Sequence, residues 1–216
     1  MHPKFPTLLL TAVLAGCAAS NIGGDYVLDS KHGTGVVAGT ITYFGSYASY
    51  RLHIANEQSN QTYRIEHGDS QTLNPLLAFK GEAINPALQR TGSAFAVELP
   101  AGTYAVRSWQ VSQGAANVWS TAPTGVQFTV QPGKAIYLGN FHFKETSRVM
   151  RAVTGASVSL NDETTRDIPA LTKSFPSLRS TPITQSLEAG TRIDSIGGKS
   201  DGRISVPIPI FVPVVR

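Results

Sequence analysis

Short stretches rich in Val, Ile, Tyr, Phe and Thr follow one another from Val36 to Leu160, with turn residues between them. A regular series of this kind is typical of an antiparallel sandwich or barrel, because each stretch is long enough for one strand and each turn reverses the chain. The pattern predicts strands at 36–44, 50–56, 61–67, 94–99, 103–111, 125–130, 135–144 and 156–160. With 216 residues, of which 41% are hydrophobic, the chain can bury one sizeable core.

Two turn sequences predict hairpins between neighbouring strands. In Leu99-Pro100-Ala101-Gly102-Thr103-Tyr104, the proline presets the turn and the glycine can adopt a positive φ. The second sequence, Gln131-Pro132-Gly133-Lys134, contains a proline-glycine pair that suits a type II turn. We expect both turns to join strands that pair with each other.

The strand at 135–144 shows a clear alternation of side chains between two faces. We expect the core face to carry Tyr137, Phe141 and Phe143, together with Ala135 and Gly139. The polar face then carries Asn140, His142 and Lys144.

A helical pattern follows the last predicted strand. Asp167 can cap a short helix that has Pro169 in its first turn. Leu171 and Phe175 lie four residues apart and therefore face the core together, and Pro176 ends the helix.

The first residues form an export pattern, with a positive charge at Lys4 and an apolar run from Leu8 to Leu14 that is too short to span a bilayer. The tetrad Leu14-Ala15-Gly16-Cys17 resembles the lipobox of bacterial lipoproteins. The resemblance implies cleavage before Cys17 and a diacylglycerol on its thiol. Because the chain has only this one cysteine, an internal disulfide is excluded. Ala18 after the cysteine implies sorting to the outer membrane.

The remaining chain divides by composition. Residues 1–16 are expected to be the signal peptide, 17–35 the lipidated cysteine and a tether, and 36–176 the β-sandwich domain. Residues 177–216 form a polar linker that ends in the apolar, proline-rich tail Val206–Arg216. Three prolines in this tail exclude a helix or a central strand. The tail is expected to pack on its own domain or to dock on a partner.

Several of these segments together resemble uncharacterised bacterial lipoproteins with transthyretin-like or carboxypeptidase-regulatory-like sandwiches. The resemblance rests on the turn 99–104, on the turn 131–134 with the following Ile136-Tyr137-Leu138-Gly139, and on Arg166-Asp167 ahead of Phe175-Pro176. It implies an all-β fold, an antiparallel β-sandwich of immunoglobulin or transthyretin type, with one short C-terminal helix and flexible tails. That group brings no catalytic residues with it.

The sequence carries no common catalytic motif after the leader. No serine lies in a Gly-x-Ser-x-Gly elbow, and no cysteine accompanies His32, His53, His67 or His142 at zinc-ligand spacing. We therefore expect no metal and no cofactor. The chain is mildly basic, with a pI near 9.3 and only 15% charged residues. Its arginines and lysines are spread along the chain, which argues against nucleic acid as a partner.

Trp109 and Trp119 flank the loop Ser112–Asn117, and tryptophans beside a mobile loop can form a platform for a carbohydrate or a peptide. Trp109 shares a strand face with Ala105 and Val111, which suits burial. The candidate binding residues are therefore Trp119, Asn117 and Gln113.

These features predict a non-catalytic binding or structural module, held by lipid on Cys17 at the outer membrane and facing the periplasm. Its expected partners are the membrane and an envelope protein or glycan. The first alternative is an envelope enzyme, a hydrolase or metal-assisted catalyst, that uses Glu66, His67 or Asp69. The second is a barrel-shaped carrier of an apolar ligand, although the early Gly-x-Trp signal of lipocalins is missing.

Overall fold

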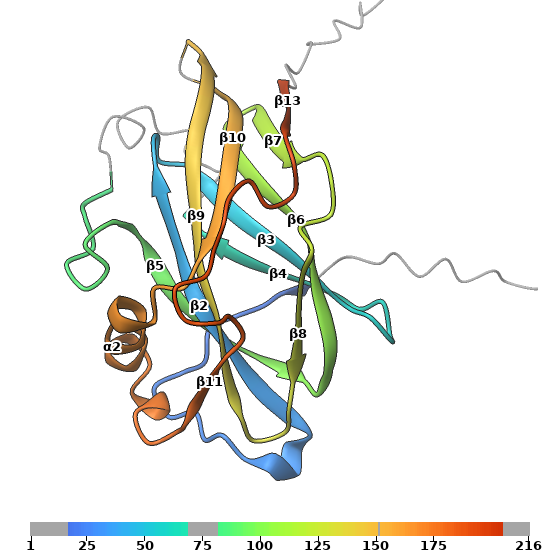
Figure 1. Cartoon of the computed structure of the whole chain (residues 1–216), viewed down its shortest axis with the longest axis vertical. Helices are drawn as coiled ribbons and strands as arrows, with labels where there is room; N and C mark the ends of the chain where they lie inside the picture. Colours follow the sequence, from blue (N-terminus) through green and yellow to red (C-terminus); the bar gives the residue numbers. More distant parts are fainter. Residues whose placement is uncertain (1–16, 69–81, 151, 205–216) are drawn as a thin grey trace, which may run out of the picture.

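The computed structural model describes residues 17–68, 82–150 and 152–204, and this part of the chain is all-β with one α-helix (Figure 1). One sheet follows the strand order β1-β4-β3-β6-β7-β13, with β8 paired to β6. The other follows β12-β10-β9-β2-β5, with β11 paired to β9. The strands of the first sheet are β1 (Cys17–Ala18), β3 (Ser49–Asn56), β4 (Thr62–His67), β6 (Gly102–Gln113), β7 (Ala116–Ser120), β8 (Val126–Val130) and β13 (Ser200–Ile204). Those of the second are β2 (Thr34–Phe44), β5 (Thr91–Pro100), β9 (Ala135–Val149), β10 (Ala152–Asn161), β11 (Ile183–Gln185) and β12 (Arg192–Ile193).

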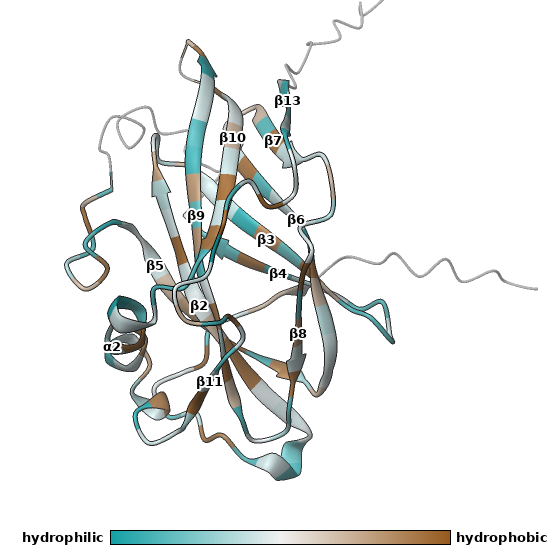
Figure 2. Cartoon of the chain, viewed as in Figure 1, coloured by the Kyte–Doolittle hydropathy of each residue, from teal (hydrophilic) through white to brown (hydrophobic). Residues whose placement is uncertain are grey.

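The two sheets pack against each other around the main core. Hydrophobic and hydrophilic residues alternate along strands such as β9 and β3 (Figure 2), and the inward set forms one continuous cluster. Its largest fully buried side chains include Leu52, Tyr104 and Trp109 from the first sheet and Ile41, Phe141 and Phe143 from the second.

Strand β2 is buried on both of its faces, because the helix α2 (Thr164–Ser174) covers the side of the second sheet that faces away from the first. Val37 and Ile41 belong to the core between the sheets. Val36 and Ala38 contact a second cluster that includes Leu171 of α2. A strand covered on both faces is apolar along most of its length, as β2 is.

All eight predicted strands are present, each with ends shifted by a few residues. The sheets, however, are not purely antiparallel. Strand β9 pairs in parallel with two strands, β2 and the short β11. Strand β1 pairs in parallel with β4. Alternation along one strand specifies its buried face and not the direction of its neighbour, so the sequence pattern did not contain this information.

Both predicted hairpins are wrong. Strand β5 ends at Pro100 in one sheet and β6 begins at Gly102 in the other, so the turn between them crosses from sheet to sheet. The turn at 131–134 makes the same kind of crossing between β8 and β9. Proline and glycine specify a sharp change of direction, and a crossover needs it as much as a hairpin does. The chain-adjacent strands that do pair are β3 with β4, β6 with β7, and β9 with β10.

The predicted core face of β9 is correct only for its second half. Between Ala38 and Thr40 of β2 the register with β9 shifts by one residue, which places a bulge beside Leu138 and Gly139. Gly139 has a φ of +115°, which a side chain would strain. As a result Phe141 and Phe143 face the core between the sheets, whereas Tyr137 lies on the α2 side together with Asn140.

The helix confirms the predicted pairing of Leu171 and Phe175, which are both buried in the cluster beneath it. It begins earlier than predicted, at Thr164, where the Asp162 side chain accepts a hydrogen bond from the backbone N–H of Thr164 at 3.1 Å. Asp167 therefore does not cap the helix. It lies one turn inside, fully buried, and binds other partners.

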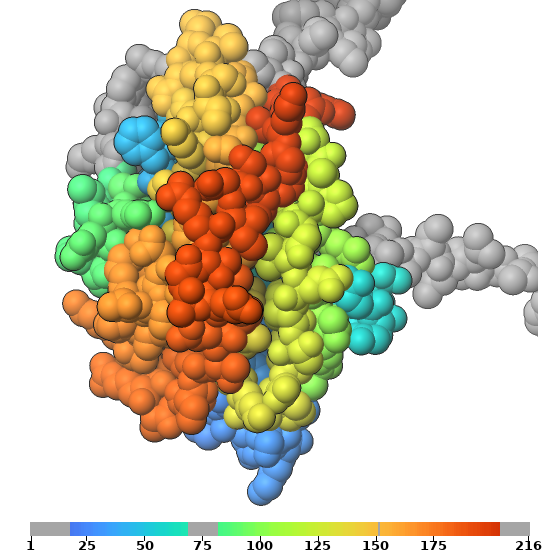
Figure 3. Space-filling view, viewed as in Figure 1, coloured from blue at the N-terminus to red at the C-terminus, as the bar shows by residue number. Residues whose placement is uncertain are grey.

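The segments on both sides of the predicted domain lie against the sheets. In residues 17–35, Ile22, Tyr26 and Leu28 pack on the cluster around α2, and a 3-10 turn spans Ser30–His32. In residues 177–204, Ile196 is buried at 3% exposure. Figure 3 shows this C-terminal segment, in red, running over the surface between α2 in orange and β8 in yellow-green. The signal peptide 1–16 and the tail Val206–Arg216 lie outside the described residues.

Candidate functional site

A groove of about 1120 Å³ lies over the polar end of the second sheet, on the side that α2 covers farther along. Five separate parts of the chain form it: the end of β2, residues 84–91 before and at the start of β5, residues 142–148 of β9, the end of β10 with the two residues after it, and residues 190–192. Its volume is slightly above the range of roughly 300–1,000 Å³ that is typical of pockets for one small ligand.

Basic side chains are the most frequent charged groups in the groove. Its lining contains Arg90, Lys144, Arg148 and Arg192, against the two carboxylates Asp162 and Glu163. The three arginines pair with carboxylates: Arg90 with Glu163 at 3.5 Å, Arg148 with Glu145 at 2.6 Å, and Arg192 with Asp194 at 3.0 Å. The side chain of Lys144 has no hydrogen-bond or ion-pair partner within the described ranges. Lys144 is therefore the cation of the lining that is open to a ligand without breaking an ion pair.

The two carboxylates are already engaged by neighbouring protein groups. Asp162 accepts hydrogen bonds from the backbone N–H groups of Thr164 and of Gly190, at 3.1 and 2.8 Å, and these bonds, with that from the Thr164 hydroxyl, hold the pKa of Asp162 below its usual value. Glu163 lies 3.5 Å from Arg90 and 3.7 Å from Arg166. Both acids thus position the walls of the groove.

A buried chain of polar side chains connects α2 to the floor of the groove. The Thr40 hydroxyl donates to Asp167 at 2.6 Å, and the Asn140 amide donates to Thr40 at 2.7 Å and to Thr42 at 3.0 Å. The Thr42 hydroxyl lies 2.9 Å from Nδ1 of His142, which lines the groove. The bulge at Gly139 makes this chain continuous, because it turns Asn140 to the same face as Thr40.

The Thr42 hydroxyl fixes the orientation of the His142 imidazole. Its oxygen lies 2.9 Å from Nδ1 of His142 and 3.2 Å from Oδ1 of Asn140, and either of these atoms can accept its hydrogen. The tautomer of His142 therefore follows from the direction in which Thr42 donates. In both tautomers Nε2 has no hydrogen-bond partner within the described ranges.

The groove keeps His142 neutral. Burial and, after it, the positive charges of Arg90, Arg166, Arg192 and Lys144 together lower its pKa from 6.5 to about 4. The imidazole is therefore uncharged at neutral pH, at a place where the charges of the surrounding protein favour an anion.

Two polar side chains of strand β10, Ser159 and Asn161, also line the groove beside His142. Ser159 lies opposite His142 in the register of β9 and β10, and the Asn161 amide donates to its hydroxyl at 3.1 Å. The Oδ1 atom of Asn161 is buried without a hydrogen-bond partner in the part of the chain that the structure describes.

The binding residues predicted from the sequence lie elsewhere, around the β6–β7 hairpin, whose turn contains only Gly114 and Ala115. Trp119 is 38% exposed and stacks on His53 with 5.7 Å between ring centroids. Asn117 accepts hydrogen bonds from Gln110 and Ser112. Gln113 bridges two segments, donating to the Tyr47 carbonyl at 2.9 Å and accepting from the Val153 amide at 3.2 Å. Of the three, Trp119 offers an exposed surface.

The residues of the enzymatic alternative are not brought together. Glu66 forms an ion pair with Arg51 at 2.8 Å on the outer face of its sheet. His67 points to the opposite face, where it contacts Ser93 at 2.7 Å and Glu82 at 2.9 Å. Asp69 lies outside the described residues.

The described ranges contain neither a candidate metal-binding cluster nor a candidate membrane-spanning helix. No group of three or more His, Cys, Asp and Glu side chains there could hold a metal ion. No helix there is long and apolar enough to cross a bilayer. Cys17 begins β1, whose backbone pairs with Tyr63 and Arg64 of β4.

Reasoning from the sequence alone did not find the groove. His142 and Lys144 were assigned correctly to a polar strand face, but such a face is usually solvated. Arg90, Glu163 and Arg192 are distant from them in sequence and share no spacing rule. The only local signal is the polar run Asn140, His142, Lys144 on a strand that is otherwise apolar.

Comparisons with known proteins give little further information. No family model and no curated protein matches the chain. Among solved structures, the chain is similar to a leucine-rich repeat protein from Bacteroides thetaiotaomicron, with 20% sequence identity and a TM-score of 0.30. The alignment covers 53% of this chain and 14% of that one, so the chain spans only a small part of the matched protein's length. A similarity at this level identifies neither a fold family nor a function.

Proposed function

We propose that the protein is a non-catalytic binding module, anchored by lipid on Cys17 at the outer membrane and facing the periplasm, that binds an envelope component in the groove described above. The observation that carries the proposal is the groove itself, where cations and a fixed neutral histidine line one concave surface. The lipobox at Leu14–Cys17 supports the location.

Within the groove, the geometry favours binding over catalysis. Nδ1 of His142 is held by a hydroxyl group and not by a carboxylate, and the carboxylates that line the groove are held by backbone amides or arginines. A general base is usually oriented by a carboxylate that stabilises its protonated form. The cations around His142 instead oppose protonation.

We also propose that the fold is a transthyretin-like or carboxypeptidase-regulatory-like sandwich. Two packed sheets joined by crossovers at 100–102 and 131–134 support this assignment.

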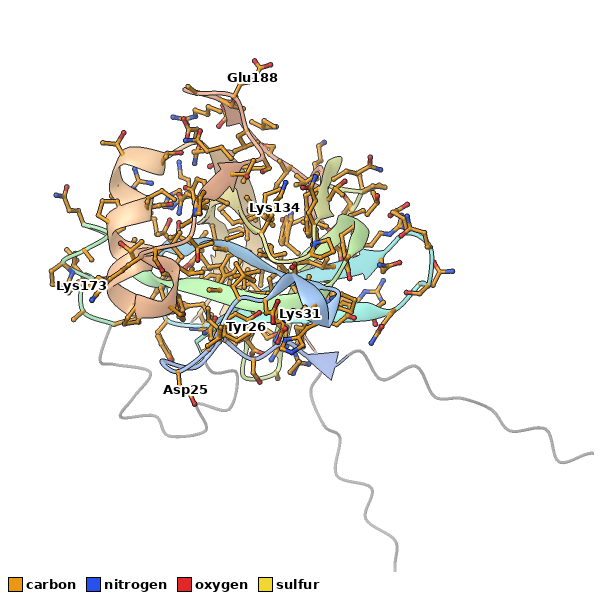
Figure 4. All side chains as sticks on the ribbon, turned by 90° about the horizontal axis from the view of Figure 1, so that it is seen from below. Asp25, Tyr26, Lys31, Lys134, Lys173 and Glu188 are labelled. Carbon is orange, nitrogen blue, oxygen red and sulfur yellow. The ribbon has the colours of Figure 1, made fainter. Side chains whose placement is uncertain are left out.

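Photocrosslinking in cells tests the groove as the binding surface. A photoreactive amino acid at Ile84, which lines the groove and is 66% exposed, should form a crosslink to an envelope component. Val27 provides the matched control, because it is apolar and 73% exposed. Its neighbour Tyr26 lies on the opposite side of the molecule from Glu188, which is close in sequence to the groove residue Gly190 (Figure 4). Crosslinks of equal yield and identity from both positions, or none from Ile84, would overturn the proposal.

A further inference from the structure

The groove presents two kinds of surface side by side. Phe44 and Ile84 line it and leave 70% and 66% of their side chains exposed. Large apolar side chains that are this exposed and lie at a concave surface commonly mark a binding site. Lys144, which pairs with Phe44 in the register of β2 and β9, belongs to the basic lining of the same groove.

We infer that the ligand of the groove is a single amphiphilic molecule with a phosphate headgroup, bound by the basic lining, and an apolar portion, bound by Phe44 and Ile84. This inference rests on the proposed function and specifies the class of its ligand.

The number and type of donors favour a phosphate headgroup. Arg90, Arg192 and Lys144 belong to one lining. The two arginines pair with Glu163 and Asp194, and each guanidinium has further N–H groups that can bind phosphate oxygens. His142 adds an uncharged hydrogen-bonding nitrogen, Nε2, in an orientation fixed through Thr42. A phosphate group offers three acceptor oxygens and close to two negative charges, so it can use more of these donors than a carboxylate can.

The shape of the surface favours one molecule over a bilayer. The lining residues come from five segments and border about 1120 Å³. A concave site of this size can enclose a headgroup and the first part of a chain, whereas a planar membrane would contact only its rim.

Calorimetric titration with dodecyl phosphate, below its critical micelle concentration and at pH 7, tests the inference. Inorganic phosphate supplies the headgroup alone, and dodecyl maltoside supplies the chain with an uncharged headgroup. We expect one site for dodecyl phosphate and at least about tenfold weaker binding of the two control compounds, because each lacks one half of the contacts. If inorganic phosphate binds as tightly as dodecyl phosphate, the apolar part of the inference is wrong. If dodecyl maltoside binds as tightly, the phosphate headgroup is wrong.

Variants then assign the contacts. Arg192→Gln and Lys144→Gln should each weaken dodecyl phosphate binding about tenfold, since each removes a charged hydrogen bond. Ile84→Ser should weaken the binding of dodecyl phosphate without changing the weak binding of inorganic phosphate. Arg203→Gln is the matched control: Arg203 is an exposed arginine that pairs with Asp201 on β13, away from the lining of the groove. Equal losses in Arg203→Gln and Arg192→Gln would overturn the inference, because they would indicate nonspecific electrostatic binding.

Vesicles containing phosphatidylglycerol separate a free lipid from a bilayer. Two results together would overturn the inference: no binding of dodecyl phosphate, and equal sedimentation of Arg192→Gln and the unmodified protein with these vesicles. They would indicate that the protein contacts a planar membrane with a surface other than the groove. The proposed function would survive these results as long as Ile84 still forms a crosslink in cells.

Discussion

Asp167 illustrates how one buried charge can organise the α2 side of the second sheet. Its side chain has no solvent exposure, and it accepts hydrogen bonds from the hydroxyls of Thr40 and Tyr137, both at 2.6 Å. Arg166 donates a hydrogen bond from Nε to Oδ1 of Asp167 at 2.8 Å, and its Nη2 atom lies 2.7 Å from the same oxygen. Burial, followed by the charge of Asp167, raises the pKa of Tyr137, so the tyrosine stays protonated and acts as a donor. A buried carboxylate of this kind is tolerated only because donors surround it.

Replacing this carboxylate should therefore destabilise the protein strongly. Asp167→Ala leaves Arg166, Tyr137 and Thr40 without their acceptor, and breaking a buried ion pair from one side typically costs about 3–5 kcal/mol. Thermal and urea unfolding of the variant would measure this loss. Asp201→Ala is the control, because it breaks an exposed pair with Arg203 and should change stability by less than about 0.5 kcal/mol. Similar losses in both variants would contradict the structural role assigned to Asp167.

His142 should contribute to the pH dependence of stability. Its pKa in the folded protein is about 4, below the ordinary value of 6.5, so between these values the unfolded chain binds a proton that the folded chain does not. Its contribution to folding is therefore complete above about pH 6.5 and is lost as the pH falls toward 4. Replacing it with asparagine should remove that part of the slope.

The measurement is the free energy of unfolding of the unmodified protein and of His142→Asn, each at pH 7, 5.5 and 4.5. The difference between the two proteins isolates His142 from other titrating groups, such as His53, whose pKa is also lowered, mainly by burial. Parallel pH profiles would show that His142 titrates normally in the folded state.

At the scale of elements, the sequence predicted where strands lie better than how they are joined. Alternation of apolar and polar residues is a local property, and it identified β2, β3 and β9 within a few residues. Whether the turn at 100–102 leads to the same sheet or to the opposite one depends on distant partners: β5 pairs with β2, and β6 pairs with β3 and β8. The strands β1, β7, β11, β12 and β13 were missed because each has at most five residues, too few for a clear alternation.

The crossover at 131–134 makes a specific demand on the strand that it touches. A Cβ atom added at Gly35 of β2 would collide with the carbonyl oxygen of Gln131 and would lie 2.8 Å from that of Lys134. Because both contacts are with backbone, the turn would have to move away from the sheet.

Gly35→Ala is therefore expected to cost about 1–3 kcal/mol, as is typical for overpacking. Chemical denaturation would show this as a lower unfolding midpoint with an unchanged slope. Gly24→Ala is the matched control, since nothing lies within 4 Å of a Cβ added there. Equal midpoints for Gly35→Ala and the unmodified protein would mean that the turn does not contact β2 as described.

For the whole molecule, the sequence predicted an all-β chain with one core and one helix, but not the groove. A groove requires the relative positions of β2, β10, the segment before β5 and the segment after α2, and none of these positions follows from local pattern. The bulge at Gly139 had the largest consequence, because one extra residue moved Tyr137 to the α2 side and made the polar network beneath the groove possible.

The segment behind the predicted lipidation site also affects how the molecule would sit at a membrane. Residues expected to form a tether contact the sheets instead: β1 pairs with β4, Ala19 donates to the Arg64 carbonyl at 2.9 Å, and Asn21 forms a bridge with Val97. A lipid on Cys17 would therefore be joined to the folded domain with almost no intervening chain. We expect a lipid-anchored form to hold the edge of the first sheet close to the bilayer surface.

The anchor itself is tested by comparing the unmodified protein with Cys17→Ala. If Cys17 carries lipid, intact-mass measurement of the membrane-extracted protein should give a chain that starts at this residue with acyl groups added. Cys17→Ala should lose both the added mass and the membrane association, because without acyl chains the protein has no stable hold on the bilayer. Ser20→Ala, a change at an exposed position three residues later, should leave both properties unchanged. A soluble, unmodified mass for the protein with Cys17 intact would disprove the anchor, while binding of dodecyl phosphate in the groove could still be tested on the soluble protein.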